Sequence, residues 1–224
     1  MQVSLKDKVA LVTGAAHRVG RAIALELARH GAHIVLHYHS SPIEVVQAAM
    51  SEIGAQRVQV EAIQADLSQP DAITQLFERV QSVFGRLDIL VNSASAFQKR
   101  GLLEITLEDW EHTMQVNLRA PFLCTQAAAR MMLAQAPRGG VIINICDQGV
   151  FKPWPDYAHH GISKAGLHAL TMVTAASLGP HIRANAVVPG PVLKPPTMPD
   201  DRWRELGERS PLQRTGAAED VARA

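Results

Sequence analysis

The stretch from Lys8 to Gly31 constrains the fold of this chain most strongly, because it combines a strand, a small-residue turn and a helix in immediate succession. Residues 9–13 (VALVT) are a continuous apolar run typical of a buried strand, and residues 14–20 form a turn that begins and ends with glycine. The helix that follows has apolar side chains four residues apart on one face, namely Val19, Ile23 and Leu27. The spacing therefore predicts a βα unit that ends near Gly31.

The turn of this unit is suited to binding a phosphate group. Backbone N–H groups and the positive end of the helix dipole converge there, and glycines let the backbone approach a dinucleotide pyrophosphate closely. The pattern is T-G-x-x-x-R-x-G, formed by Thr13, Gly14, Arg18 and Gly20, rather than G-x-G-x-x-G. Arg18 stands where the related pattern T-G-x-x-x-G-x-G has glycine. Taken alone, the stretch is also compatible with an ordinary βα turn.

The rest of the chain alternates between predicted strands and helices. Further strands are predicted at residues 33–39, 57–67, 87–95, 139–147 and 183–190. Helices are predicted at residues 42–53, 70–84, 106–135 and 156–178, with Thr106 and Asp109 as a capping pair for the third of these. Continuous apolar strands joined by short connections predict a parallel sheet that is covered on both faces. We therefore expect a doubly wound, Rossmann-type α/β fold, as a single domain over residues 1–224.

Two C-terminal segments depart from this alternation. Residues 191–203 (PVLKPPTMPDDRW) are rich in proline and show no periodicity, so residues 191–210 are expected to form either a substrate lid or a plain surface loop. Their position beyond the end of a strand favours the lid. The last residues, 217–224, resemble the first turns of a helix, and we expect the natural protein to continue with a final strand that is absent here.

Composition argues against several classes of partner. The net charge of +1 gives no electrostatic reason to expect nucleic acid or an anionic membrane as a partner. Cys124 and Cys146 lie within apolar segments rather than at metal-ligand spacing, which suits reduced thiols in a cytosol, and no metal site is expected. No stretch resembles a signal peptide or reaches the length needed to span a membrane. The expected location is the cytoplasm.

Several short motifs resemble those of one enzyme family. They are the T-G-x-x-x-R-x-G turn, Asp66 after the third strand, Asn92-Ser93-Ala94-Ser95 after the fourth, Asn117, and Ser163-Lys164. Over nearly its full length the chain resembles the short-chain dehydrogenases/reductases. Within that family it is most similar to the pteridine reductases, on the basis of Arg18, residues 36–39 (LHYH), residues 95–97 (SAF) and Asp147.

Gly14, Asp66, residues 92–95, Asp147 and Pro189-Gly190 lie at predicted strand ends, where ligands bind in this fold. The second strand ends in His37, Tyr38, His39 and Ser40, with no carboxylate to bind a ribose 2′-hydroxyl, while Arg18 can pair with a phosphate. NADP(H) is therefore the expected cofactor. By resemblance Asp66 would bind the adenine, although it can equally cap the following helix. The expected cofactor-binding residues are Gly14, Arg18, Val19, Gly20, Tyr38, His39, Ser40, Asp66, Leu67, Asn92, Ala94, Ser95, Lys164, Pro189 and Gly190.

The resemblance also implies catalytic roles. Asn117 would bend its helix and hold a water molecule of the proton relay, and Lys164 would bind the nicotinamide ribose and lower the pKa of a neighbouring acid. The family has its catalytic tyrosine four residues before this lysine, one helical turn away, and His160 occupies that position here. Tyr157 lies three residues earlier. The expected catalytic set is Asn117, Asp147, His160 and Lys164.

Three interpretations of His160 compete. Asp147, at the end of the fifth strand, can favour an imidazolium that donates a proton near pH 7. Alternatively His160 is inert, because its ring reaches about 2 Å less far than a phenol, and Tyr157 or water delivers the proton or turnover is slow. A third interpretation is a chance or engineered substitution.

The expected activity is hydride transfer to a small molecule. Phe97 is where the pteridine reductases stack a pterin ring, although a phenylalanine here can also be part of the core. The expected substrate-binding residues are Arg18, Ser95, Phe97, Asp147 and Tyr157. The substrate would carry a dihydropterin-like C=N bond or a carbonyl. The alternative is an NADP(H)-binding protein with impaired catalysis, acting as a sensor or as a subunit of a hetero-oligomer. The family resemblance implies a homotetramer assembled through the helices at 106–135 and 156–178.

Overall fold

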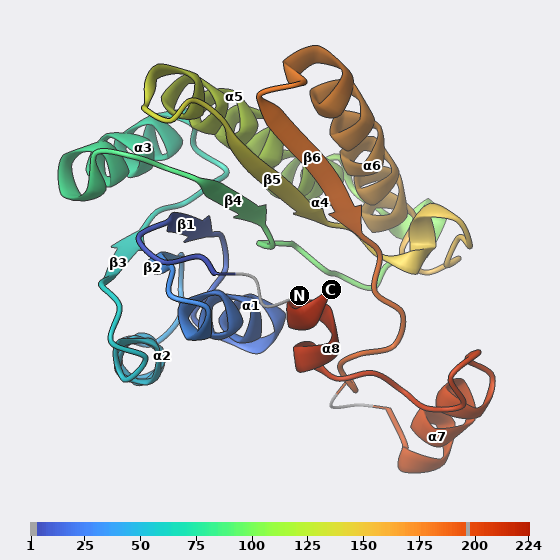
Figure 1. Cartoon of the computed structure of the whole chain (residues 1–224). Coiled ribbons are helices and arrows are strands. Elements are labelled where there is room, and N and C mark those ends of the chain that lie inside the picture. The colour runs from blue at the N-terminus through green and yellow to red at the C-terminus, as the bar shows by residue number, and fades with distance from the viewer. Residues whose placement is uncertain (1–3, 196–197) are drawn as a thin grey trace.

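The computed structural model describes residues 4–195 and 198–224, and its centre is a parallel sheet (Figure 1). In this part of the chain the sheet has six strands in the order β3-β2-β1-β4-β5-β6. The strands are β1 Val9–Val12, β2 His33–Tyr38, β3 Val60–Gln64, β4 Ile89–Asn92, β5 Gly140–Ile145 and β6 Ile182–Val187. After β3 the chain crosses over β1 to start β4, so the strand order reverses between β1 and β4. Ligands of open parallel sheets bind at such a reversal.

Helices cover both faces of this sheet (Figure 1). The α-helices of the described residues are α1 Arg18–Arg29, α2 Ile43–Gly54, α3 Pro70–Phe84, α4 Leu107–Met114, α5 Ala120–Ala134, α6 Ala158–Leu178, α7 Asp200–Glu208 and α8 Ala218–Arg223. One core cluster joins Leu11, Val35 and Leu90 to α3 and α5. A second joins Val12, Ile34 and Leu36 to α1, α2 and α8. The prediction of a single doubly wound α/β domain is thereby confirmed.

The predicted helix over 106–135 is not one continuous α-helix. Helix α4 begins after the expected capping pair, since Thr106 Oγ1 accepts the N–H of Asp109 at 3.1 Å. A π-helical turn, Gln115–Arg119, then separates α4 from α5. An extra residue in a turn of this kind changes which side chains face the sheet. The turn contains the buried Asn117, whose contacts are described below.

The segment expected to form a lid or a loop contains a helix. The sequence pattern does not indicate this helix, because several prolines precede it. Helix α7 starts after Pro199 and has Asp200 and Asp201 in its first turn, where carboxylates favour the helix dipole. Pro196 and Thr197, also within the expected lid, lie outside the described residues. The chain returns to the start of this segment after α7, because the N–H of Gly216 donates to the carbonyl of Pro191 at 2.9 Å.

The last described element, α8, confirms the helix expected at the end of the chain. It packs beside α1, and its Val221 is buried in the second core cluster (Figure 1). Over the described ranges, no helix combines the length and apolar character needed to cross a bilayer.

Candidate active site

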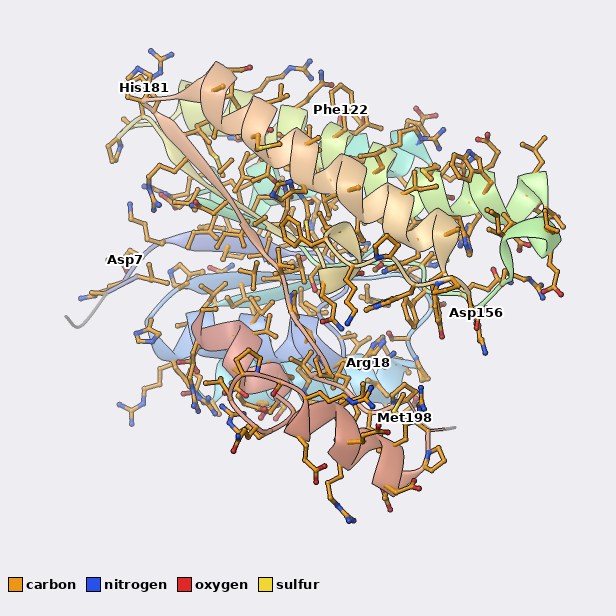
Figure 2. All side chains as sticks on the ribbon, turned by 90° about the vertical axis from the view of Figure 1, so that its right-hand side faces the viewer. Asp7, Arg18, Phe122, Asp156, His181 and Met198 are labelled. Carbon is orange, nitrogen blue, oxygen red and sulfur yellow. The ribbon has the colours of Figure 1, made fainter. Side chains whose placement is uncertain are left out.

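The predicted site residues gather at the carboxyl ends of the strands. All neighbouring strands pair in parallel, so these ends share one edge of the sheet. Arg18 and Asp156 lie toward this end of the molecule, whereas Asp7 and His181, which precede β1 and β6, lie toward the other (Figure 2).

The turn after β1 has room only for glycine at two positions. Gly14 has a φ of +67°, and a Cβ there would lie 3.0 Å from the Cα of Ala94. A Cβ on Gly20 would lie 2.3 Å from the carbonyl oxygen of Gly14. The turn is therefore tightly wound, and Gly14 and Gly20 leave no side chain between the backbone segments that meet there. This geometry fits the pyrophosphate of a dinucleotide, which needs direct access to backbone N–H groups.

Two N–H groups at the start of the turn are already paired. The N–H of Gly14 donates to Nδ1 of His37 at 3.1 Å, and the N–H of Ala15 donates to the carbonyl of His37 at 2.9 Å. They are therefore not the unpaired donors that the sequence predicts along this turn. The donors left for a phosphate belong to the first turn of α1, which starts at Arg18 and leaves its initial N–H groups without helical partners.

Arg18 itself is exposed at the start of α1 and has a φ of +56°. This left-handed conformation explains why the related pattern has glycine at this position. Val19, the next residue, is half-buried and packs against the second core cluster.

The end of β2 would face the ribose of a bound nucleotide. Tyr38 packs against the second core cluster, whereas His39 and Ser40 are exposed. Beside them, His17 Nδ1 lies 3.3 Å from the hydroxyl oxygen of Ser41, a contact between the residue before α1 and the loop before α2 that the sequence did not indicate. These side chains offer hydrogen-bond donors, and none of them is a carboxylate.

Asp66 follows β3 and stabilises the turn before α3. Its Oδ1 accepts the N–H of Ser68 at 2.9 Å, whereas the N-cap position of α3 is Gln69 and has no side-chain cap, so Asp66 does not cap the helix. Its contact with an adenine stays a prediction. Burial by itself would raise the pKa of Asp66, but the hydrogen bonds from Ser68 and the nearby His39 bring that pKa below its ordinary value. The adjacent Leu67 is buried in the first core cluster.

The residues after β4 form the floor of the site. Asn92 is buried and its amide donates to Asn144 Oδ1 at 2.8 Å, so only its backbone remains for contact with a nucleotide. Thr13 Oγ1 accepts the N–H groups of Ser93 and Ala94 at 2.9 and 3.0 Å, which ties this segment to β1. The exposed Ser95 hydroxyl lies 3.3 Å from Asn117 Oδ1.

Asp147 and His160 are in direct contact at the centre of the site. Asp147 Oδ2 lies 2.5 Å from His160 Nε2, and Asp147 Oδ1 accepts the N–H of Gly149 at 2.7 Å. Burial by itself would raise the pKa of Asp147, but the His160 hydrogen bond and charge bring it below its usual range. The side chain of His160 is 4% exposed and that of Asp147 is 15% exposed.

The other ring nitrogen of His160 is also engaged. Nδ1 lies 3.1 Å from the carbonyl oxygen of Ala96 and 3.3 Å from Asn117 Nδ2. Asn117 Nδ2 also donates to the Ala96 carbonyl and to Ser163 Oγ, at 2.9 and 3.0 Å. Both ring nitrogens of His160 therefore have a hydrogen-bonding partner within the protein.

Lys164 is held one helical turn beyond His160. Its Nζ donates to the carbonyl of Ile145 at 2.8 Å and is buried. Burial lowers the pKa of Lys164, while the nearby Cys146 and Asp147 act in the opposite direction. The ammonium thus stands beside Asp147 and also favours its ionised form.

Aromatic rings form the open side of the site. Phe97 is 55% exposed and stacks on Tyr157, with ring centroids 4.6 Å apart and planes at 15°. It meets His160 edge to face at 4.7 Å and Trp154 at 6.4 Å. Phe97 therefore presents an accessible ring rather than a core residue. Trp154 also belongs to this group of rings, although no sequence motif indicated it.

The segment that follows β6 lies along the remaining side of the site. The carbonyl of Pro189 accepts the N–H of Gln148 at 3.2 Å, and Gly190 is exposed. These contacts bring the segment after β6 beside the turn that follows Asp147. Among the described residues there is no group of three or more histidine, cysteine or acidic side chains placed to hold a metal ion.

Comparison with known proteins identifies the family. The model for the family described as enoyl-(acyl carrier protein) reductase matches residues 14–224. A short-chain type dehydrogenase/reductase of Picea abies is 35% identical over 97% of this chain and 84% of its own length. The 3-oxoacyl-[acyl-carrier-protein] reductase FabG of Staphylococcus epidermidis is 35% identical over 96% of this chain and 88% of its own.

A sugar dehydrogenase and a solved structure agree with these relatives. The L-rhamnose 1-dehydrogenase (NAD(P)(+)) of a Sphingomonas species is 34% identical over 97% of this chain and 87% of its own. A crystal structure from Sinorhizobium meliloti 1021, described as a short-chain alcohol dehydrogenase, superposes with a TM-score of 0.90. It is 30% identical, and the match covers 98% of this chain and 87% of that one. The chain therefore belongs to the short-chain dehydrogenase/reductase family.

Proposed function

We propose that this protein is an NADP(H)-dependent reductase of a dihydropterin-like C=N bond or of a carbonyl. The observation that carries the proposal is the 2.5 Å contact between Asp147 and His160 at the strand ends, beneath the accessible ring of Phe97. It combines a proton source with a flat apolar surface, which are the two requirements for reducing a planar ring.

The cofactor would be held by the first turn of α1 and by the ends of β2 and β4. NADPH, when bound, supplies the hydride. Arg18, His39 and Ser40 can donate to an additional phosphate, and the lack of a carboxylate at the end of β2 favours NADPH over NADH. Lys164 would leave its contact with the Ile145 carbonyl in order to donate to the nicotinamide ribose.

The chain itself would supply the proton. His160 has both ring nitrogens engaged, so it cannot present a free N–H to a substrate without moving. Asp147 is the more exposed partner. We assign a relay in which His160 Nε2 passes its proton to the ionised Asp147 carboxylate across the short contact while that carboxyl group gives a proton to the substrate, so the step leaves His160 neutral and Asp147 ionised. Asn117 and Lys164 hold this pair in place, through the Ala96 carbonyl and through charge respectively.

A second candidate function is NADP(H) binding with little catalysis, as in a sensor or a subunit of a hetero-oligomer. The observation that favours it is the burial of His160, whose ring has a hydrogen-bonding partner at each nitrogen. A proton donor of this kind releases its proton only if the site rearranges.

Calorimetric titration tests the cofactor, and NADPH oxidation tests the reaction. We expect NADPH to bind at least about tenfold more tightly than NADH, since one charge-assisted contact is worth at least 1.4 kcal/mol. Oxidation of NADPH would then be followed with dihydrobiopterin and with a panel of ketones. Failure of the folded chain to bind NADPH would overturn the proposal, and binding without turnover on any compound would favour the second candidate.

Variants of the Asp147–His160 pair separate proton delivery from cofactor binding. We expect Asp147→Asn and His160→Phe to lower turnover about 100-fold while leaving the Kd for NADPH within about twofold, because general acid catalysis contributes roughly that factor. Asp156→Asn, which removes an exposed carboxylate paired with Lys99, is the matched control and should not change turnover. Full activity in Asp147→Asn would contradict the assignment.

A further inference from the structure

His37 lies where the ends of three strands meet, and the proton pathway does not use it. It is the penultimate residue of β2 and its side chain is buried, with 2% of the residue exposed. On one side its ring reaches the turn after β1, and on the other the residue after β3. A buried polar ring in this position has to satisfy both of its nitrogens with hydrogen bonds.

The contacts of His37 fix its tautomer. Nδ1 accepts the N–H of Gly14 at 3.1 Å, so Nδ1 carries no hydrogen. Nε2 lies 3.0 Å from the carbonyl oxygen of Ala65 and therefore donates its hydrogen there. The ring thus acts as a neutral bridge, with an acceptor toward the glycine turn and a donor toward β3.

The backbone of the same residue binds the next position of the turn. The carbonyl of His37 accepts the N–H of Ala15 at 2.9 Å. Residue 37 consequently binds two successive N–H groups, one through its ring and one through its backbone. Gly14 is the residue with a φ of +67°, so the ring contact holds the left-handed point of the turn.

We propose that His37 is a positioning residue for the cofactor, which sets the conformation of the glycine turn through its Nδ1 contact with the Gly14 N–H. With Gly14 and Ala15 turned toward His37, the first turn of α1 presents the remaining N–H groups outward. This inference rests on the proposed function, because it assigns the turn to the pyrophosphate of NADP(H). His37 touches no reacting atom, so it affects affinity for the nucleotide rather than the chemical step.

Three substitutions separate the two ring contacts. His37→Asn places a carbonyl oxygen close to the position of Nδ1, so the acceptor for the Gly14 N–H is kept. His37→Gln places its amide nitrogen close to the position of Nε2, so the donor toward Ala65 is kept and the Gly14 N–H loses its acceptor. His37→Leu removes both contacts while keeping an apolar side chain of moderate size.

The readout is the Kd for NADPH, measured by calorimetry, together with kcat at saturating NADPH. We expect His37→Asn to bind within about threefold of the unaltered chain, and His37→Gln and His37→Leu to bind about tenfold more weakly, the effect of one unpaired buried N–H. We expect kcat to change less than about twofold in all three. His37 would strengthen the binding of NADPH equally in the ground state and in the transition state, so its loss does not change the chemical step. If His37→Leu does not fold, the Asn and Gln variants still carry the comparison.

Thr171→Val is the control for lost stability alone. The Thr171 hydroxyl is buried on α6, where it donates to the Leu167 carbonyl and accepts from Asn144. Its removal should lower the unfolding midpoint and leave the Kd unchanged. Equal Kd values for the unaltered chain and His37→Gln, or equal weakening in the Asn and Gln variants, would overturn the positioning role while NADPH binding stands. If the unaltered chain does not bind NADPH, the proposed function fails and this inference fails with it.

Discussion

The backbone conformation of Arg18 lowers the stability of the fold, whereas its side chain favours the binding of an anion. Its φ of +56° is a conformation that costs an L-residue about 1–2 kcal/mol relative to the right-handed region. Its guanidinium, in contrast, is exposed at the start of α1, where an anion would bind. An arginine at this position thus lowers stability locally while it adds a positive charge to the site.

We expect Arg18→Gly to raise the free energy of unfolding by about 0.5–1 kcal/mol, the strain relieved less the entropy that glycine loses on folding. The same change should weaken NADPH binding about tenfold or more, because a charge-assisted contact is lost. Urea unfolding and calorimetry measure the two effects. Arg18→Ala is the matched variant, since it removes the charge and keeps the strained φ, so it should weaken binding without the gain in stability. Equal stability of the Gly and Ala variants would contradict the strain argument.

At the residue scale, the sequence motifs predicted local geometry better than they predicted contacts between residues far apart in the sequence. Gly14 and Gly20 have the steric restrictions that their pattern implies, and Asp147 and His160 lie in contact. The roles of His37, His17 and Trp154 were not predictable, because their contacts connect residues far apart in the sequence and depend on the sheet register and loop paths. The roles of the predicted catalytic and binding residues stay predictions.

At the scale of elements, the π-helical turn between α4 and α5 brings Asn117 into the site. Asn117 Oδ1 accepts the N–H of Ala96 at 2.7 Å, and its Nδ2 donates to the Ala96 carbonyl. The loop after β4 is therefore attached to a helix on the opposite side of the site. The sequence predicted an unusual asparagine within a helix, but not the extra residue per turn, because the apolar pattern on either side reads as one helix.

We expect Asn117→Ala to lower the free energy of unfolding by about 2 kcal/mol, because the part-buried Ala96 N–H loses its acceptor and the Ala96 carbonyl loses one of its partners. Thr125→Val on α5 is a matched control, since the buried Thr125 hydroxyl has no hydrogen-bond partner among the described residues. That change should not lower the free energy of unfolding, because it removes an unpaired buried hydroxyl. Urea unfolding of both variants measures the difference. Equal effects would show that the π-helical turn is stable without the asparagine.

Strands and most helices were predictable because their apolar patterns are long and regular. Helix α3 has the predicted bounds, Pro70–Phe84, since proline suits its first position and Gly85 adopts a left-handed φ of +67° after its end. Helix α7 was not predicted, because it is short, polar and preceded by several prolines.

For the whole molecule, pH should act strongly through His37. Burial lowers the pKa of His37 from 6.5 to about 4, although the hydrogen bond to Ala65 opposes this and His39 adds to it. The ring stays neutral in the folded state, while the unfolded state takes up a proton below about pH 6.5. The contribution of the neutral His37 ring to the free energy of unfolding is therefore fully present above that pH. About 3 kcal/mol of this contribution is lost as the pH falls toward 4.

The slope of unfolding free energy against pH measures this effect. Between pH 6 and 5, His37→Asn should reduce the slope by about 1.4 kcal/mol per pH unit, the effect of one proton. Thr171→Val should lower stability at every pH without changing the slope. An unchanged slope in His37→Asn would show that the ring is protonated equally in both states.

The assembly of several chains stays a prediction at this scale. Phe122 on α5 and Met172 and Val173 on α6 are exposed apolar residues, 43%, 58% and 60% accessible. They lie on the two helices through which the family resemblance implies a tetramer. Composition alone did not indicate them, because which side of a helix is exposed depends on how it packs on the sheet.

The hydrogen bond from Gly216 to Pro191 has a consequence for the segment between them. A stretch that departs and returns at the same point can be exchanged for one of another size without moving β6 or α8. Changes in length between Pro191 and Gly216 are therefore expected to leave the ends of the neighbouring strands in place.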